Sequence, residues 1–197
     1  GAGKTSIGRA LLAQEAESGT SIDLSISVTT RPRRPSEVEG VHYYFRSVRQ
    51  FEAMRAQGEL LESAEVHGNW YGTPAEPVEA ALAGGQDVLF DIDWQGTRQV
   101  AEAKPDDVVT VFILPPSVEE LRSRLERRAE DSPDVIAQRL KNAREEIGHW
   151  EEYHYLVVNR DLEESVEAVR SILHAERRRP ERQADLRQLA QRLIEEL

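Results

Sequence analysis

Residues 1–6 of this 197-residue chain read Gly1-Ala2-Gly3-Lys4-Thr5-Ser6, and this stretch decides the fold class. It matches the second half of the phosphate-loop pattern GxxxxGK(S/T). In that pattern, backbone N–H groups at a helix N-terminus bind phosphates, the lysine reaches the outer phosphates and the hydroxyl binds Mg²⁺. We therefore expect all six residues to bind ATP. The first glycine of the pattern and the buried strand before it would lie upstream of Gly1, so we interpret the sequence as a fragment and expect this literal polypeptide to be poorly folded or nearly inactive.

Beyond the loop, predicted helices and strands alternate along the chain. Helices are predicted over 4–18, 48–57, 74–83, 117–129, 133–151, 162–178 and 183–196. Strands are predicted over 22–28, 43–45, 60–66, 70–71, 88–93, 108–114 and 155–158. Apolar strands that alternate with helices favour a parallel sheet covered on both faces. Residues 31–83 break this alternation and favour an inserted α+β subdomain.

The composition favours a soluble cytoplasmic protein. Hydrophobic residues make up 39% and charged residues 31% of the chain, and no apolar stretch is long enough to cross a bilayer. The formal net charge of −11 argues against binding to nucleic acid or to an anionic membrane. With no cysteine, the chain has neither disulfides nor a thiolate metal site.

A second motif follows the first predicted strand. Residues 25–37 read SISVTTRPRRPSE and resemble the S-x-S-x-T-T-R-x-P-R-x-x-E signature of guanylate kinases, except that Pro32 and Arg33 stand where the family has any residue followed by proline. The resemblance continues through the segments 38–45, 60–73, 91–96 and 157–159.

This resemblance implies a P-loop nucleoside-monophosphate kinase with a three-layer α/β/α fold. Its parts would be a core, a GMP-binding subdomain and a helical lid. The expected bounds are 1–30, 84–120 and 152–197 for the core, 31–83 for the subdomain and 121–151 for the lid. The implied reaction is ATP + GMP ⇌ ADP + GDP with Mg²⁺, and dGMP is a further expected substrate.

Residues that match the family's GMP site fall into two chemical groups. Arginines and tyrosines would hold the phosphate, because a guanidinium is a planar and always charged donor. A carboxylate would read guanine, because it accepts from N1–H and N2–H together, whereas adenine presents an acceptor at N1. The phosphate group comprises Arg31, Arg34, Tyr43 and Tyr71, with Glu37 in the same motif. The base group comprises Glu62, the hydroxyls of Ser27 and Thr73, and the further carboxylate of Asp93.

The remaining site residues concern the metal and the transferred phosphoryl group. Asp91 and Asp93 end an apolar strand and are expected on the same side, with Asp91 and Thr5 supporting Mg²⁺. Three arginines resemble lid arginines that close over the phosphates and would act with Lys4 and Arg31: Arg124, Arg128 and Arg139. The competing interpretation is a solvated helix in which they pair with Glu126, Glu130 and Asp131. Asn159 matches a position beside the ATP adenine.

Two other functions stay open at this point. The first is a non-catalytic guanylate-kinase-like module that binds phosphopeptides, which the retained Lys4, Thr5 and Asp91 argue against. The second is a kinase of the same fold that acts on a ribose phosphate, for which Glu62 would have no base to read. The sequence does not decide between a monomer and a homo-oligomer. The amphipathic helix 183–196 could pack on the body or on a partner subunit.

Overall fold

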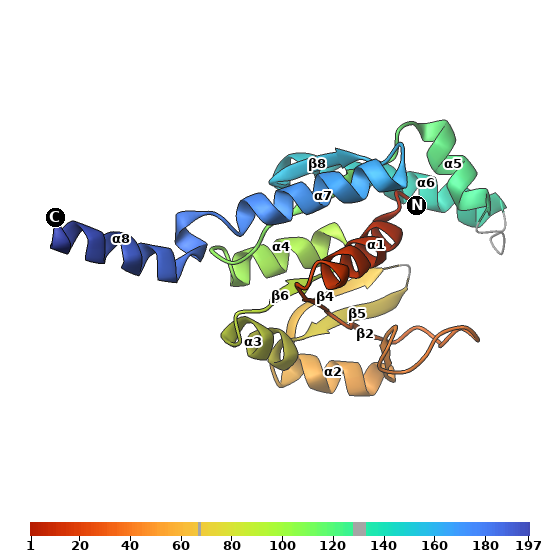
Figure 1. Ribbon diagram of the computed structural model, residues 1–197. Coiled ribbons are helices and arrows are strands. Elements are labelled where there is room, and N and C mark those ends of the chain that lie inside the picture. Colours follow the sequence, from red (N-terminus) through yellow and green to blue (C-terminus); the bar gives the residue numbers. More distant parts are fainter. Residues whose placement is uncertain (67, 128–132) are drawn as a thin grey trace.

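Two pairs of parallel strands support the body of the protein (Figure 1). The computed structural model describes residues 1–66, 68–127 and 133–197. β1 (Ile22–Leu24) pairs with β6 (Asp87–Leu89), and β7 (Val111–Leu114) pairs with β8 (Tyr155–Val158). The parallel direction agrees with the expected α/β fold, but the pairs form two separate sheets, because no strand among these described ranges hydrogen-bonds to both.

The predicted strand over 22–28 is wrong, because the chain passes there from one sheet to another. After β1, Ser25 N–H still bonds the Leu89 carbonyl, and the chain then enters β2 (Val28–Thr29). Both residues of β2 are buried, so the alternation that suggested one continuous strand ends before them. β2 belongs to a four-stranded sheet of order β3-β2-β5-β4.

Three strands of this sheet lie in residues 31–83, the region expected to form an inserted α+β subdomain, whereas β2 precedes that region. The three strands are β3 (Tyr44–Phe45), β4 (Leu60–Val66) and β5 (Asn69–Pro74), and the helices α2 (Val48–Ala56) and α3 (Ala75–Ala83) accompany them. Phe51 of α2 is fully buried and stacks on Trp70 at a centroid distance of 5.9 Å. The register places Glu62 of β4 opposite Thr73 of β5, which brings two predicted base-reading residues together.

Three helices cover the body, and further helices extend from it (Figure 1). The covering helices are α1 (Lys4–Glu17), α4 (Trp94–Ala103) and α7 (Leu162–Glu176). The predicted lid contains α5 (Val118–Arg127) and α6 (Pro133–Gly148), followed by the 3₁₀ turn η1 (Trp150–Glu152). A core of Ile7, Leu11, Ile113, Val157 and Val166 joins α1 and α7 to the β7–β8 pair.

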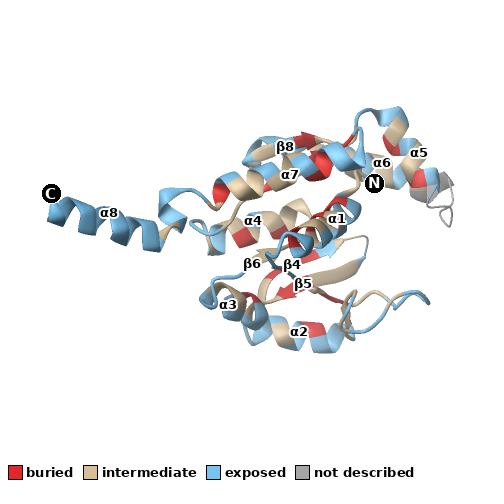
Figure 2. Cartoon of the chain, viewed as in Figure 1, coloured by how far each residue is buried: buried red, intermediate tan, exposed pale blue. Residues whose placement is uncertain are grey.

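The C-terminal helix α8 (Ala184–Glu196) follows the turn η2 (Pro180–Arg182) and projects away from the body (Figure 1). It has no buried residue and is exposed along its length in Figure 2. Its leucines are therefore not packed on the body, which was one of the two expectations for this helix. Among the described residues, no helix has the length and apolar character needed to cross a membrane.

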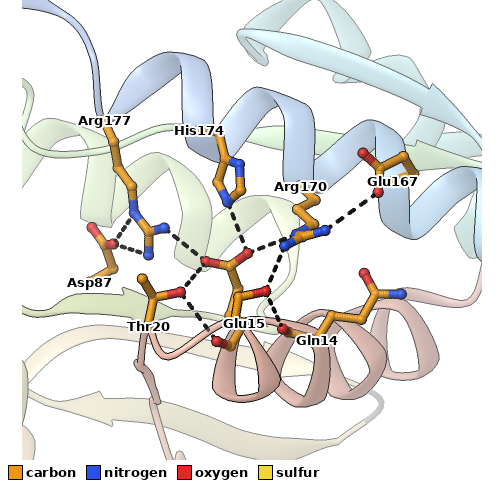
Figure 3. Close-up of polar contacts among 9 residues, drawn as sticks. Gln14, Glu15, Thr20, Asp87, Glu167, Arg170, His174 and Arg177 are labelled. Atoms are coloured by element: carbon orange, nitrogen blue, oxygen red, sulfur yellow. Dashed lines mark hydrogen bonds and ion pairs between the residues drawn. The ribbon is translucent and has the colours of Figure 1, made fainter.

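A buried carboxylate fixes the end of α1 to α7 (Figure 3). Glu15 has no exposed surface. Its partners are one hydroxyl, two guanidinium groups and one imidazole: Thr20 (2.7 Å), Arg170 (2.9 Å), Arg177 (2.8 Å) and His174 (2.9 Å). Burial alone would raise the pKa of Glu15, but these hydrogen bonds outweigh it and lower the pKa to about 2. Arg177 also bonds Asp87 of β6 at 2.7 Å, so this Glu15 cluster joins α1, α7 and the first sheet.

Candidate active site

The phosphate loop begins the chain and leads directly into α1. Gly3 has φ = 100°, a left-handed conformation that favours glycine, and a Cβ there would overlap the Asn159 amide. Lys4, Thr5 and Ser6 are exposed in the first helical turn, which contains no acidic residue and has no side-chain cap. The positive end of the helix dipole is therefore available to an anion, as the motif predicts.

Thr5 and Asp91 form the closest polar contact of this loop. The Thr5 hydroxyl donates to Asp91 Oδ2 at 2.5 Å, and both residues are exposed. A hydroxyl and a carboxylate are hard oxygen ligands, which suits Mg²⁺, an ion that usually takes one or two protein ligands and completes its shell with water and phosphate. The described part of the chain contains no group of three or more His, Cys, Asp or Glu residues that could hold a metal ion.

Asn159 and Arg124 hold the phosphate loop through hydrogen bonds to its backbone. Asn159 is 6% exposed, and its Nδ2 donates to the Ala2 carbonyl at 2.8 Å. Arg124 donates to the same carbonyl at 3.4 Å and to the Asn159 carbonyl at 3.0 Å. The Ser165 hydroxyl lies 3.1 Å from Asn159 Oδ1 and orients the amide. These contacts give Asn159 a loop-supporting role that the sequence did not reveal; its contact with adenine stays a prediction.

The predicted lid meets the loop through α5. A Cβ on Gly1 would lie 2.6 Å from the Leu121 side chain, so the first residue packs closely on this helix. Arg124 Nε pairs with Glu120 at 2.7 Å, which is an i,i+4 pair but not with the carboxylates expected from the sequence. Arg139 is half-buried on α6, whereas Arg128, Glu130 and Asp131 lie outside the described residues.

On the opposite side of the site, Glu62 is a buried carboxylate. It is 4% exposed, and Thr73 donates a hydrogen bond of 2.8 Å to its Oε1. A Cβ on Gly96 would lie 2.6 Å from Glu62 Oε2, so glycine is needed to admit the carboxylate against α4. Burial raises the pKa of Glu62 to about 7; the Thr73 hydrogen bond opposes this shift and the charge of Asp93 adds to it.

Asp93 is the N-cap residue directly before α4, near Glu62. Its Oδ1 accepts from Gly96 N–H at 2.9 Å, so it caps the helix, and its Oδ2 accepts from Gln95 at 3.1 Å. The expectation that Asp91 and Asp93 share one side rested on strand alternation. That argument does not apply, because β6 ends at Leu89 and the two carboxylates have different partners.

The arginine-rich turn is ordered by Glu37. Its two oxygens accept from the Arg31 guanidinium at 2.5 Å and from Arg34 N–H at 2.8 Å. Arg31 also lies 5.5 Å from the Tyr43 ring centroid. Burial would lower the pKa of Arg31, but its hydrogen bonds with Glu37 and Tyr71 raise it. Arg33 and Arg34 are exposed, so the turn carries three cations, of which Arg31 is held by Glu37.

Two tyrosines of the predicted GMP-phosphate group, Tyr43 and Tyr71, lie in contact with each other. Tyr43 and Tyr71 meet edge to face at 6.0 Å. Burial raises the pKa of Tyr43, and the charge of Asp91, the partner of Thr5, acts in the same direction. Ser27, half-buried beside them, accepts Tyr44 N–H through its carbonyl at 2.9 Å. The structure thus brings Tyr43 and Tyr71 together, and Tyr43 lies near enough to Asp91 for its charge to act on the hydroxyl.

Comparison with known proteins decides the family. The family model described as guanylate kinase matches residues 1–176. The chain belongs to the guanylate kinase family. It is 57% identical over 196 residues to the guanylate kinase of Chelativorans sp. (strain BNC1), covering 100% of this chain and 88% of the relative. It is 58% identical over 196 residues to the guanylate kinase of Rhizobium etli, covering 100% of this chain and 87% of the relative.

A solved guanylate kinase has the same fold. The crystal structure of guanylate kinase from Anaplasma phagocytophilum is 40% identical to this chain, with a TM-score of 0.76, covering 91% of this chain and 88% of that one. Within this guanylate kinase fold, three supporting residues were missed by the sequence analysis: Glu120, Gly96 and Ser165. Only Gly96 had a usable signal, since it stands in the quoted segment 91–96. The helix α4 to which it belongs was not predicted.

Proposed function

We propose that the chain transfers the γ-phosphoryl group of ATP to GMP and forms ADP and GDP. The observation that carries this proposal is the buried Glu62 carboxylate, oriented by Thr73. An ionised carboxylate accepts two hydrogen bonds from guanine N1–H and N2–H, whereas the N1 acceptor of adenine would face it unfavourably. The guanylate kinases to which the chain is similar support the same substrate.

On the donor side, residues 1–6 would hold the ATP phosphates, with Lys4 at the outer ones. Thr5 and Asp91 would hold Mg²⁺. When bound, this ion neutralises charge on the phosphate oxygens. Asn159 and Arg124 keep the loop in place through the Ala2 carbonyl.

On the acceptor side, Arg31 and Arg34 would bind the GMP phosphate together with Tyr43 and Tyr71. That phosphate is already anionic, so the attack on ATP needs no general base. Phosphoryl transfer depends on in-line positioning and on neutralising the developing charge. Arg124, with Arg128 and Arg139, is the group proposed to supply that charge. The proposal includes dGMP as a second acceptor and the cytoplasm as the compartment.

The test is a coupled assay of ADP formation by an N-terminally extended form of the chain, with ATP, Mg²⁺ and GMP, AMP, CMP, UMP or ribose 5-phosphate in turn. We expect turnover with GMP and with dGMP, and at most weak turnover with the others. Lys4→Ala should abolish turnover while GMP binding measured by calorimetry is kept. Turnover with ribose 5-phosphate alone, or phosphopeptide binding without any turnover, would overturn the proposal in favour of the corresponding alternative.

A further inference from the structure

A stacked pair of rings joins α4 to the residue that directly follows α6. The Trp94 and His149 rings are nearly parallel, at an interplanar angle of 12° and a centroid distance of 3.7 Å. Arg98 lies 5.1 Å from the Trp94 ring centroid and forms hydrogen bonds of 2.7 to 3.1 Å with Glu152. His149 Nδ1 lies 2.7 Å from the same carboxylate. We call these four residues the Trp94–His149 junction.

The helix on one side of the junction also forms a wall of the acceptor pocket. Trp94 is the first residue of α4, directly after Asp93, and Gly96, two residues further on, abuts Glu62. Gln99 then bonds both backbone groups of Ser63, accepting at 3.0 Å and donating at 2.9 Å. α4 is therefore held against β4, the strand that carries Glu62. The same helix contributes Trp94 and Arg98 to the junction.

The other side of the junction is the end of the predicted lid. His149 directly follows the last residue of α6, and its N–H bonds the Glu146 carbonyl at 3.2 Å. Arg139 lies about 15 Å back along the same helix, at about 1.5 Å per residue. A rotation of about 10° at His149 would thus displace Arg139 by about 2.5 Å, and errors of about 1 Å in catalytic positioning cost about 100-fold in rate.

The exposure of the junction argues for orientation and against a main role in stability. The Arg98 and Glu152 side chains are 47% and 40% exposed, and exposed ion pairs stabilise a fold by only about 0–1 kcal/mol. The junction also borders a pocket of about 230 Å³, lined in part by Thr97, Tyr153 and His154. The stack therefore lies at the edge of an open space and not inside a packed core.

We propose that Trp94 and His149 are positioning residues that set the orientation of α6, and so of Arg139, relative to the acceptor pocket. The proposal rests on the proposed function, since it concerns transfer to GMP. GMP bound against Glu62 and α4 biases the orientation of α6 through the stacked rings. Substrate occupancy and lid position are in this way coupled across the Trp94–His149 junction.

The test compares kcat and KM of the wild-type protein with those of His149→Ala, Trp94→Ala and His149→Phe. The two alanine variants should lower kcat by about tenfold or more, with each KM changed by less than about threefold. His149→Phe keeps an aromatic ring for the stack and should retain kcat within about threefold of wild type. Trp150→Ala is the matched control, because Trp150 is the next residue and is 43% exposed, and it should leave kcat unchanged.

A second measurement separates coupling from loss of structure. GMP affinity is measured by calorimetry with and without a non-reacting ATP analogue. The analogue should tighten GMP binding by about fivefold or more in wild type and by less than about twofold in His149→Ala, with affinity for GMP alone unchanged. Trp94→Ala, which removes the other ring of the stack, gives the same comparison if His149→Ala does not fold.

Equal kcat and equal coupling in wild type and in folded His149→Ala or Trp94→Ala would overturn the positioning role while leaving the proposed function intact. Equal losses in His149→Phe and His149→Ala would also overturn it, since the stack would then not be the determinant. If wild type phosphorylates no GMP at all, the proposed function itself fails. The two failures are therefore distinguishable.

Discussion

The Thr73 hydroxyl donates to Glu62 Oε1 at 2.8 Å, between side chains that are both buried. One hydrogen bond does not replace the water lost by the carboxylate, so burial raises the pKa of Glu62 from its ordinary 4.5 to about 7. Near neutral pH, and without GMP, the Glu62 carboxyl is therefore partly protonated. Guanine recognition requires the ionised form, so base binding and proton loss are linked at this residue.

The first prediction is that GMP affinity increases with pH across neutrality. Because only ionised Glu62 accepts from N1–H and N2–H, the Kd for GMP should fall about tenfold from about pH 6 to about pH 8. Calorimetry at about pH 6.5 in buffers of different ionisation enthalpy should show proton release on binding. The GMP phosphate itself titrates at about pH 6. Glu62→Gln is therefore the control that shows how much of the pH dependence comes from the phosphate. An identical pH profile in Glu62→Gln would remove Glu62 from the base site.

The second prediction is that Glu62→Gln raises the free energy of unfolding and weakens the recognition of GMP. The raised pKa means that protonated Glu62 contributes stability that is fully present below pH 4.5 and lost as pH rises to about 7. A neutral amide avoids this loss, so at about pH 8 the variant should unfold with a free energy about 1–3 kcal/mol higher than wild type, and the gain should shrink on acidification. Urea denaturation of both proteins at about pH 8 and at an acidic pH measures this difference in unfolding free energy. In the ADP assay the same variant should raise KM for GMP about tenfold or more and leave KM for ATP within about twofold.

The sequence predicted those parts of the site whose geometry is local. The half-loop at residues 1–6 places Lys4 and Thr5 in the first turn of a helix, and the structure confirms that helix. The β4–β5 pairing that joins Glu62 and Thr73 follows from two short strands close in sequence. Each of these features depends on contacts within a few residues or across one hairpin.

Features that depend on distant contacts were missed. Residues 22–28 alternate as one strand should, but the structure divides them between two sheets, because pairing with β6 and with β5 decides where each piece lies. The helical period places Glu15 beside Leu11 on α1. It gives no sign that two guanidinium groups and one imidazole, from α7 and the residue after it, surround Glu15. Asn159 likewise bonds Ala2, which lies at the other end of the chain.

The third prediction concerns Arg124, whose guanidinium bonds the Ala2 and Asn159 carbonyls and pairs with Glu120. Arg124→Ala should lower kcat about 100-fold and change each KM less than about threefold, since charge neutralisation acts mainly in the transition state. Arg127 is the matched control, because it pairs with the same Glu120 while its side chain is 67% exposed. Arg127→Ala should leave kcat within about twofold. A rise in KM for ATP without loss of kcat in Arg124→Ala would assign Arg124 to ground-state binding.

The fourth prediction is that the Glu15 cluster governs stability and not the chemistry of transfer. Glu15 has no exposed surface and forms ion pairs with Arg170 and Arg177. Glu15→Gln removes this buried anion from the two cations and should lower the free energy of unfolding by about 3 kcal/mol. Urea denaturation at neutral pH measures the loss. The pKa of Glu15 is depressed from 4.5 to about 2, so its contribution is present above pH 4.5 and is lost as pH falls toward 2, and the difference from wild type should shrink over that range. Glu17→Gln, at an exposed position on the same helix, should change stability by less than about 0.5 kcal/mol. If kcat fell in Glu15→Gln while the unfolding free energy did not, the cluster would act on the phosphate loop through α1 and not as an anchor between α1 and α7.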